Sequence, residues 1–220
     1  MNKTSEAKKR VVIVDDHPLV RDRLAQLINH EPDMLVCGEA EDAEQALKII
    51  RQQLPSLAIV DITLKQSNGL EVIKAIKAQN IEVPVLVLSM HEESLYADRA
   101  IRAGASGYIT KHQPAEEVLS AIRRVMSGNI YLSEKLTSGY LKSILSGTKI
   151  APQTVAALTD RELEVLTLIG RGSAKRDIAR TLQLGIPTVN THCARIKEKL
   201  NLKSAAELQH FAFRWVRERE

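Results

Sequence analysis

The sequence predicts an α/β domain followed by a small all-helical domain. In residues 11–127, short apolar runs rich in Val and Ile alternate with stretches of helical periodicity. This alternation is typical of a doubly wound parallel sheet with helices on both faces. From residue 158 to the end, apolar residues follow helical spacing only. A chain of 220 residues is long enough for two such domains.

Five apolar runs are the strand candidates, and the predicted helices alternate with them. The runs lie near residues 11–15, 34–39, 57–61, 84–89 and 106–110. Because the runs are apolar along their length, both faces of the sheet are expected to be buried, as in a parallel sheet. The fifth helix, about residues 114–127, starts with Pro114 and ends at Gly128.

The domain boundaries follow from changes in this pattern. Residues 1–9 lack an apolar signal core and are expected to be a disordered lead-in. Residues 10–128 form the α/β domain. Residues 129–157 are expected to be a linker with one helix, capped by Ser133, and the flexible stretch SGTKIAPQT. Residues 158–220 form the helical domain.

Capping and turn residues predict four helices in the second domain. Thr159 and Glu162 have the spacing of a capping box at the start of the first helix. Ser173 can cap the second helix, and a third helix follows after a short glycine turn, at about residues 186–200. This arrangement is the signature of a helix-turn-helix. The last helix runs from about Ser204 to the end of the chain.

Composition and charge narrow the class of protein. No apolar stretch approaches the roughly 20 residues of a membrane span, and two distant cysteines do not suggest a disulfide framework. We therefore expect a cytoplasmic protein without a membrane partner. Residues 1–155 hold 19 basic and 19 acidic side chains, whereas residues 156–220 hold 12 and 8, so the net charge of +4 belongs to the second domain. A basic unit of this kind favours a nucleic-acid partner.

Four of the predicted strands end in residues suited to phosphoryl chemistry. These residues are Asp15 and Asp16, then Asp61, Ser89 and Lys111. The carboxyl ends of parallel strands meet at one edge of the sheet, where open α/β sheets bind ligands. Asp61 is the candidate nucleophile, because a carboxylate can accept a phosphoryl group as an acyl phosphate. The three carboxylates suit Mg²⁺ (or Mn²⁺), while Ser89 and Lys111 can contact phosphoryl oxygens.

Two sets of motifs carry a resemblance to a known family. In the first domain they are VDDHPLV, the Asp of IVDITL, the Ser of LSM, and GYITK. In the second they are LTDRELEVL, KRDIA, and TVNTH followed by KEKLNLKSAAEL. Residues 10–128 resemble a response-regulator receiver domain, and residues 158–210 resemble the LuxR-type DNA-binding domain. Nearly the whole chain thus resembles a NarL/FixJ-type two-component response regulator.

The resemblance implies the sheet order 2-1-3-4-5 of the flavodoxin-like fold and a sensor histidine kinase that phosphorylates Asp61. It implies that the backbone carbonyl of Thr63 binds the metal and that Ser89 and Tyr108 form the switch. The chain departs from the family at Lys65, where such receivers often have Pro. An extra cation there is expected to alter kinase docking or the lifetime of the phosphate. Phosphorylation is expected to expose the DNA-binding domain and to favour dimers.

The third helix of the second domain is expected to enter the DNA major groove. Asn190 can read adenine through two hydrogen bonds, and Arg195 can read guanine. The methyl groups of Thr188 and Thr191 can meet thymine, with Ala194 beside them. The candidates for phosphate contacts are Lys175, Arg176, Lys197 and Lys199.

Three of the seven aromatic residues lie near the end of the chain, at Phe211, Phe213 and Trp215. One small core cannot take all three. Phe213 and Trp215 are therefore candidates for a dimer seam, since aromatic residues are enriched at interfaces. A symmetric dimer implies a two-fold symmetric DNA site.

Three functions are open at this point. The first is a phosphorylation-controlled, DNA-binding transcription regulator. The second is a phosphatase or phosphotransferase with an aspartyl-phosphate intermediate. Haloacid-dehalogenase-like enzymes place a second Asp two residues after the nucleophile, and Thr63 at that position argues against turnover. The third is a DNA-binding protein that acts without phosphorylation and uses its first domain for assembly.

Overall fold

The computed structural model describes residues 7–64, 67–90, 93–134, 137–138, 155 and 157–218. The chain divides into two compact units, Met1–Ser133 and Glu134–Glu220, and each is described by itself. Most of the expected lead-in, Lys65, and most of the helix expected after Ser133 lie outside the described residues. None of the helices in the described ranges is long and apolar enough to cross a membrane.

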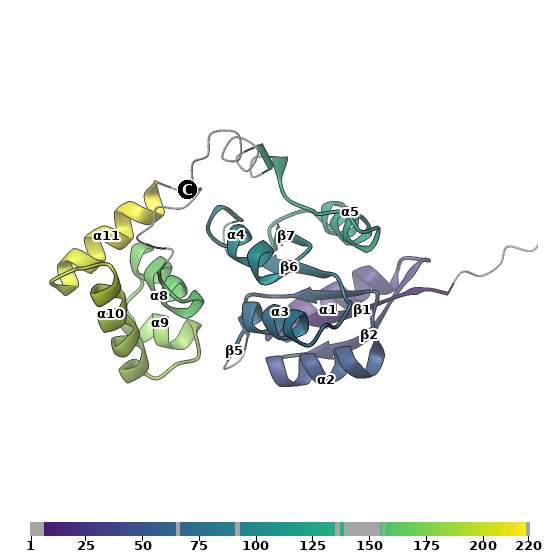
Figure 1. Ribbon diagram of the computed structural model, residues 1–220, viewed down its shortest axis with the longest axis horizontal. Helices are drawn as coiled ribbons and strands as arrows, with labels where there is room; N and C mark the ends of the chain where they lie inside the picture. The colour runs from purple at the N-terminus through teal and green to yellow at the C-terminus, as the bar shows by residue number, and fades with distance from the viewer. Residues whose placement is uncertain are drawn as a thin grey trace, which may run out of the picture. The chain divides into compact units, whose positions relative to one another are not determined.

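The first unit contains a five-stranded parallel sheet in the order β2-β1-β3-β6-β7 (Figure 1). Its strands are β1 (Lys9–Val14), β2 (Met34–Ala40), β3 (Leu57–Val60), β6 (Val85–Ser89) and β7 (Gly107–Thr110). Counted along this sheet, the order is 2-1-3-4-5, which confirms the flavodoxin-like order. All five predicted strands are present, with small shifts at their ends.

Helices cover both faces of this sheet. They are α1 (Pro18–Asn29), α2 (Ala43–Gln53), α3 (Gly69–Ala78), α4 (Glu93–Ala103) and α5 (Ala115–Met126). Successive side chains of a strand point to opposite faces, and Val11 and Ile13 of β1 share a core with residues of α1 and α5. Helices α2, α3 and α4 contact one another in sequence and cover the other face (Figure 1). The sheet is therefore doubly wound, as predicted.

A short hairpin after β3 is a feature that the sequence did not predict. β4 (Thr63–Leu64) pairs in antiparallel fashion with β5 (Ser67–Asn68). The Leu70 N–H then donates to Asn68 Oδ1 at 2.8 Å, which caps the start of α3. Strands of two residues are too short to show the alternation that identifies a strand in a sequence.

The residues after α5 add to the edge of the sheet at β7. Tyr131 forms a parallel bridge with Gly107. The Tyr108 N–H donates to the Tyr131 carbonyl at 2.9 Å, and the Tyr131 N–H donates to the Ser106 carbonyl at 3.1 Å. The Tyr131 hydroxyl donates to the carboxylate of Glu117 on α5. Tyr131, which was expected in the linker, thus pairs with the edge of the first unit's sheet. The domain boundaries given above stay a prediction.

From Asp160 on, the second unit consists of α8 (Asp160–Gly170), α9 (Lys175–Thr181), α10 (Ile186–Lys199) and α11 (Ala205–Arg217). The capping box is confirmed, with the Thr159 N–H donating to Glu162 Oε2 at 2.7 Å and the Glu162 N–H donating to Thr159 Oγ1 at 3.3 Å. The expected Ser173 cap is wrong, because α9 starts one residue later, with Ala174 as its N-cap. The Ser173 N–H instead closes the end of α8 by donating to the Leu168 carbonyl at 3.0 Å.

Candidate functional site

Three strand ends of the first unit bring two carboxylates and an ammonium group together. Asp15 follows β1, Asp61 follows β3 and Lys111 follows β7. Lys111 Nζ lies 2.5 Å from Asp15 Oδ2 and 2.6 Å from Asp61 Oδ2. All three side chains are buried. Asp15, Asp61 and Lys111 were predicted at the ends of three strands. In the structure, Lys111 contacts both aspartates at one edge of the sheet.

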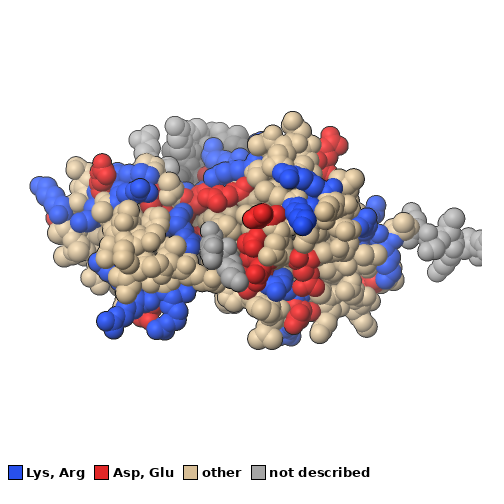
Figure 2. Space-filling view, turned by 90° about the horizontal axis from the view of Figure 1, so that it is seen from below, with Lys and Arg blue, Asp and Glu red and all other residues tan. Residues whose placement is uncertain are grey.

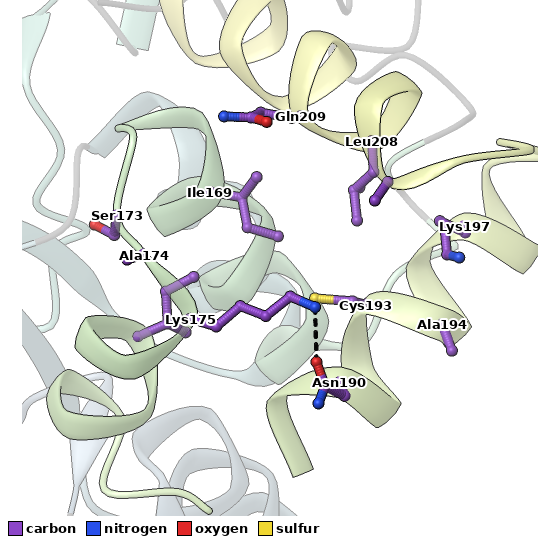
Figure 3. Close-up of a pocket in the computed structure, with 12 residues that line it drawn as sticks. Ile169, Ser173, Ala174, Lys175, Asn190, Cys193, Ala194, Lys197, Leu208 and Gln209 are labelled. Carbon is purple, nitrogen blue, oxygen red and sulfur yellow. Dashed lines mark hydrogen bonds between the residues drawn. The ribbon is translucent and has the colours of Figure 1, made fainter. Parts of the chain in front are cut away.

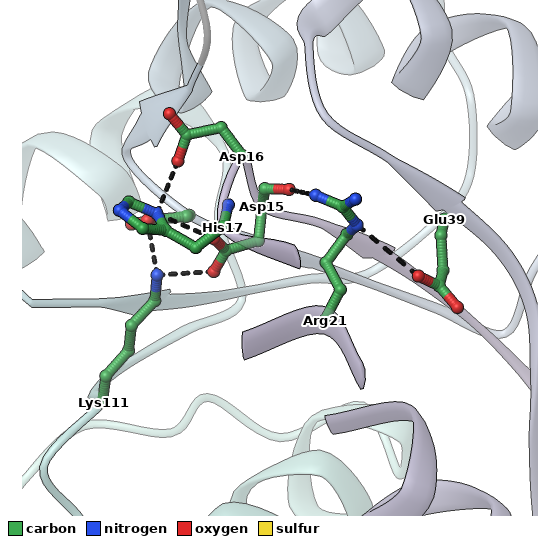
Figure 4. Close-up of polar contacts among 7 residues, drawn as sticks. Asp15, Asp16, His17, Arg21, Glu39 and Lys111 are labelled. Carbon is green, nitrogen blue, oxygen red and sulfur yellow. Dashed lines mark hydrogen bonds and ion pairs between the residues drawn. The ribbon is translucent and has the colours of Figure 1, made fainter. Parts of the chain in front are cut away.

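Asp16 and His17 lie beside these residues (Figure 4). Asp15, Asp16, His17 and Asp61 are called the acid cluster below. One ligand atom from each of Asp15, Asp16, His17 and Asp61 lies within 4.8 Å of all the others. His17 Nδ1 is 2.6 Å from Asp16 Oδ1 and 3.3 Å from Asp15 Oδ1. The sequence prediction of the site did not include His17. Its position directly after the two aspartates is the one signal that could have indicated it.

One ammonium group does not balance three carboxylates in a buried site. Burial raises the pKa of Asp61 to about 6, the Lys111 ammonium opposes the rise, and the Asp15 carboxylate adds to it. Burial lowers the pKa of Lys111, but Asp61 and Asp15 outweigh this effect and raise it. A divalent cation would supply the missing positive charge, and carboxylate oxygens are the ligands that hard cations prefer. The acid cluster is therefore consistent with a divalent metal site.

Hydrogen bonds of Arg21 and His17 hold the turn that carries Asp15 and Asp16. Arg21 of α1 donates from Nη1 to the Asp15 carbonyl at 2.6 Å, and its Nε lies 3.5 Å from Glu39 Oε2 on β2 (Figure 4). The His17 N–H donates to Asp15 Oδ1 at 2.9 Å. Both α1 and β2 therefore help to orient the carboxylates, a role for Arg21 that the sequence did not reveal.

Gly69 lies directly against the main chain of Asp61. A Cβ atom at Gly69 would be 1.9 Å from the Asp61 carbonyl oxygen, closer than any real contact, and main-chain atoms cannot easily move away. The Gly69 N–H also donates to the Ile62 carbonyl at 2.7 Å. Thr63, the other candidate metal ligand, lies opposite Asn68 in the adjoining hairpin. The first turn of α3 and this hairpin thus set the position of Asp61.

Ser89 connects the acid cluster to a buried tyrosine. Ser89 ends β6 and is fully buried, as are Tyr108 of β7 and Tyr96 of α4. Burial raises the pKa of Tyr108, and the neighbouring Tyr96 and Asp61 raise it further. Hydrogen bonding with the Ser89 hydroxyl acts in the opposite direction on Tyr108 and also lowers the pKa of Asp61. In this structure the side chain of the expected switch residue Tyr108 therefore points inward.

The second unit presents the predicted base-reading residues on one side of α10. The exposed residues of this side are Thr188, Asn190, Thr191, Ala194 and Arg195. The residues that face the core are Val189, Cys193 and Ile196. Lysine and arginine side chains gather at several places on the surface of this unit (Figure 2). Within the described part of the second unit, this side of α10 is therefore accessible to a large partner.

The candidates for phosphate contacts have different surroundings. Lys175 and Arg176 are exposed and Lys197 is half-buried. Lys199 Nζ lies 2.7 Å from Glu162 Oε2, so this lysine stabilises the start of α8. A cavity of about 390 Å³ lies between α9, α10 and α11, and Lys175 crosses it to reach Asn190 (Figure 3).

The two dimer candidates of α11 are not equivalent. Phe213 is 56% exposed, whereas Trp215 is 7% exposed and belongs to the buried residues of the helix. Trp215 therefore offers little surface to a partner in this structure, and its part in a dimer seam stays a prediction. Phe213 alone keeps the exposure that a dimer seam requires.

An acid cluster on a flavodoxin-like sheet and a helix-turn-helix in one chain define a two-domain signalling regulator. The family model for the response regulator receiver domain matches residues 11–123, and the model for bacterial regulatory proteins of the luxR family matches residues 156–212. The chain belongs to the response regulators, as a receiver joined to a luxR-family domain. It is a regulator of transcription and not a turnover enzyme, which decides against the phosphatase alternative.

Two relatives match the chain over both domains, and a solved structure matches a shorter part of it. The chain is 32% identical to the oxygen regulatory protein NreC of Staphylococcus carnosus, over 93% of this chain and 97% of that protein. It is 33% identical to the nitrate/nitrite response regulator protein NarL of Escherichia coli, over 90% of this chain and 91% of that protein. The crystal structure of a LuxR-family response regulator from Aurantimonas sp. is similar over 63% of this chain and 99% of that chain, with a TM-score of 0.58 and 32% identity.

Proposed function

We propose that this chain is a phosphorylation-controlled transcription regulator whose receiver accepts a phosphoryl group on Asp61 with the help of Mg²⁺ (or Mn²⁺). The observation that carries the proposal is the contact of Lys111 with both Asp15 and Asp61. These groups can accept, neutralise and register one phosphoryl group. A sensor histidine kinase is the proposed donor, since the receiver family implies one.

In the proposed reaction, an Asp61 carboxylate oxygen attacks phosphorus while the bond to the donor's imidazole nitrogen breaks. The donor's ring keeps the electron pair of that bond. Lys111 then exchanges its contact with the Asp61 carboxylate for one with a phosphoryl oxygen, and the Ser89 hydroxyl donates to another.

Asp15, Asp16, Asp61 and the Thr63 carbonyl are the proposed ligands of the cation. The cation offsets the negative charge of the carboxylates and of the phosphoryl oxygens when it is bound. This assignment agrees with the raised pKa of Asp61, because burial and the Asp15 carboxylate both disfavour its charged form and a bound cation would oppose them.

The proposed output begins at Ser89, whose hydroxyl interacts with both Asp61 and Tyr108. When Ser89 turns to the phosphoryl group, its interaction with Tyr108 changes, and so does the packing against α4. A coupling of about 1–3 kcal/mol would shift the balance between two states about 5–150-fold. The expected result is exposure of the DNA-reading helix and a homodimer on a two-fold symmetric site. A kinase donor and a DNA target also imply a cytoplasmic location.

Three proteins test the central step: wild type, Asp61→Asn, and Asp22→Asn as a control for an exposed Asp on α1. Each is incubated with a small phosphodonor, with Mg²⁺ or with a chelator, and analysed by intact mass. We expect one phosphoryl adduct on wild type and Asp22→Asn, with Mg²⁺ only, and none on Asp61→Asn. Wild type without an adduct would refute the proposal and favour the phosphorylation-independent alternative.

A further inference from the structure

One polar contact of the second unit joins the two helices that approach DNA in the proposed function. Lys175, the first residue of α9, donates from Nζ to Asn190 Oδ1 on α10 at 2.8 Å. The Lys175 side chain extends along the cavity, and its ammonium group lies next to the carboxamide oxygen of Asn190 (Figure 3). Both residues are exposed. The contact therefore lies on the surface that faces a partner of α10.

This contact orients the carboxamide group of Asn190. An ammonium group has donors only, so it can face the carboxamide oxygen and not the NH₂ group. The NH₂ group of Asn190 must then point away from Lys175. The usual reading of adenine by Asn needs both ends of the carboxamide, the oxygen for the adenine N6 amino group and the nitrogen for N7. The Lys175 ammonium group uses one of the two lone pairs of Asn190 Oδ1 and places a positive charge beside the other, which opposes the approach of the adenine amino group to the same oxygen.

We propose that Lys175 is a specificity-determining residue, which orients Asn190 as a donor and makes it select guanine over adenine. Guanine presents two acceptors in the major groove, N7 and O6, and the two hydrogens of one NH₂ group can meet them. Adenine presents N7 beside an amino group that would face the Asn190 donors. The proposal rests on the DNA-binding function proposed above. It replaces the expectation that Asn190 reads adenine.

The ammonium group of Lys175 also has two further donors, which can contact a phosphate at the same time. The same lysine can thus contribute to affinity and to base choice. Arg176, the next residue, is also exposed, and among the described residues it forms no hydrogen bond with Asn190. It provides the matched control for loss of one positive charge from the start of α9.

The test is selection of binding sites from randomised double-stranded DNA by the full chain, with phosphodonor and Mg²⁺ present. Wild type is compared with Lys175→Met, Arg176→Met and Asn190→Ala. The base position read by Asn190 is the one whose preference disappears in Asn190→Ala. Circular dichroism checks that each variant is folded, as expected for exposed positions.

We expect wild type to select guanine at that position and Lys175→Met to select adenine, with a change of about tenfold or more in the ratio of the two affinities. Arg176→Met should weaken binding to all sequences and leave the guanine preference in place. The proposal is overturned if Lys175→Met keeps the wild-type preference, because Lys175 is then a phosphate contact only. It is also overturned if wild type selects adenine. If wild type enriches no sequence at all, the DNA-binding function itself is refuted.

Discussion

The negative charge of Asp61 lowers the stability of the receiver when no metal is bound, and replacing Asp61 by Asn removes this charge. Asp61 is 3% exposed, and its contact with Lys111 does not compensate for burial and for the nearby Asp15 carboxylate. The variant keeps the shape of the side chain, and Lys111 keeps Asp15 as a partner at 2.5 Å. We therefore expect Asp61→Asn to be more stable than wild type in the presence of a chelator at neutral pH.

The pKa of Asp61 gives the size and sign of this effect. The pKa rises from 3.8 in the unfolded chain to about 6 in the folded one. The folded state thus binds more protons between these values, so wild-type stability falls as the pH rises through about 4 to 6. Two pKa units correspond to about 3 kcal/mol. The advantage of Asp61→Asn should be absent below about pH 4 and complete above about pH 7.

Calorimetry of the full chain with a chelator, over a series of pH values, measures the difference. The unfolding transition of the receiver is identified as the one whose midpoint temperature rises when Mg²⁺ is added to wild type. We expect the midpoint of Asp61→Asn to exceed that of wild type by about 10 °C near pH 7.5 and the gap to narrow when Mg²⁺ is added. Asp22→Asn is the control and should follow wild type. A gap that does not grow with pH would refute the reasoning.

Three further predictions test other parts of the structure. Gly69→Ala should slow formation of the phosphoryl adduct on Asp61, followed by intact mass, because the new Cβ would lie 1.9 Å from the carbonyl oxygen of Asp61; an unchanged rate would contradict the proposed support. Lys111→Met should bind Mg²⁺ more tightly in calorimetric titration, because the ammonium group no longer competes for the two carboxylates; weaker binding would argue against competition. Thr159→Ala should destabilise the second unit by about 1 kcal/mol through loss of the N-cap, measured in urea by fluorescence of Trp215, the single tryptophan, while adduct formation stays normal.

The sheet and its acid edge were predictable because their signals are local. Buried parallel strands read as apolar runs, and the carboxyl ends of such strands share one edge. Asp15, Asp61 and Lys111 therefore come together although 46 and 50 residues separate them along the chain. The capping box at Thr159 is likewise written in the spacing of two residues.

Other parts of the site depend on contacts that no spacing encodes. The Arg21 contact with the Asp15 carbonyl requires α1 to lie beside the turn, and the Gly69 contact requires the hairpin before α3. Tyr131 was expected in a linker, yet it pairs with the edge of β7. The hydrogen bond from Lys175 to Asn190 joins α9 to α10. Each of these contacts follows from how elements pack, which sequence periodicity does not report.

The most direct test of the account compares DNA affinity before and after phosphorylation of Asp61. Fluorescence anisotropy with a DNA site selected by the protein is measured for wild type and Asp61→Asn, with Mg²⁺ and with or without a phosphodonor. Intact mass gives the phosphorylated fraction of each sample. We expect the phosphodonor to raise the affinity of wild type about 5–150-fold and to leave Asp61→Asn unchanged. Equal affinity for phosphorylated and unphosphorylated wild type would contradict the account.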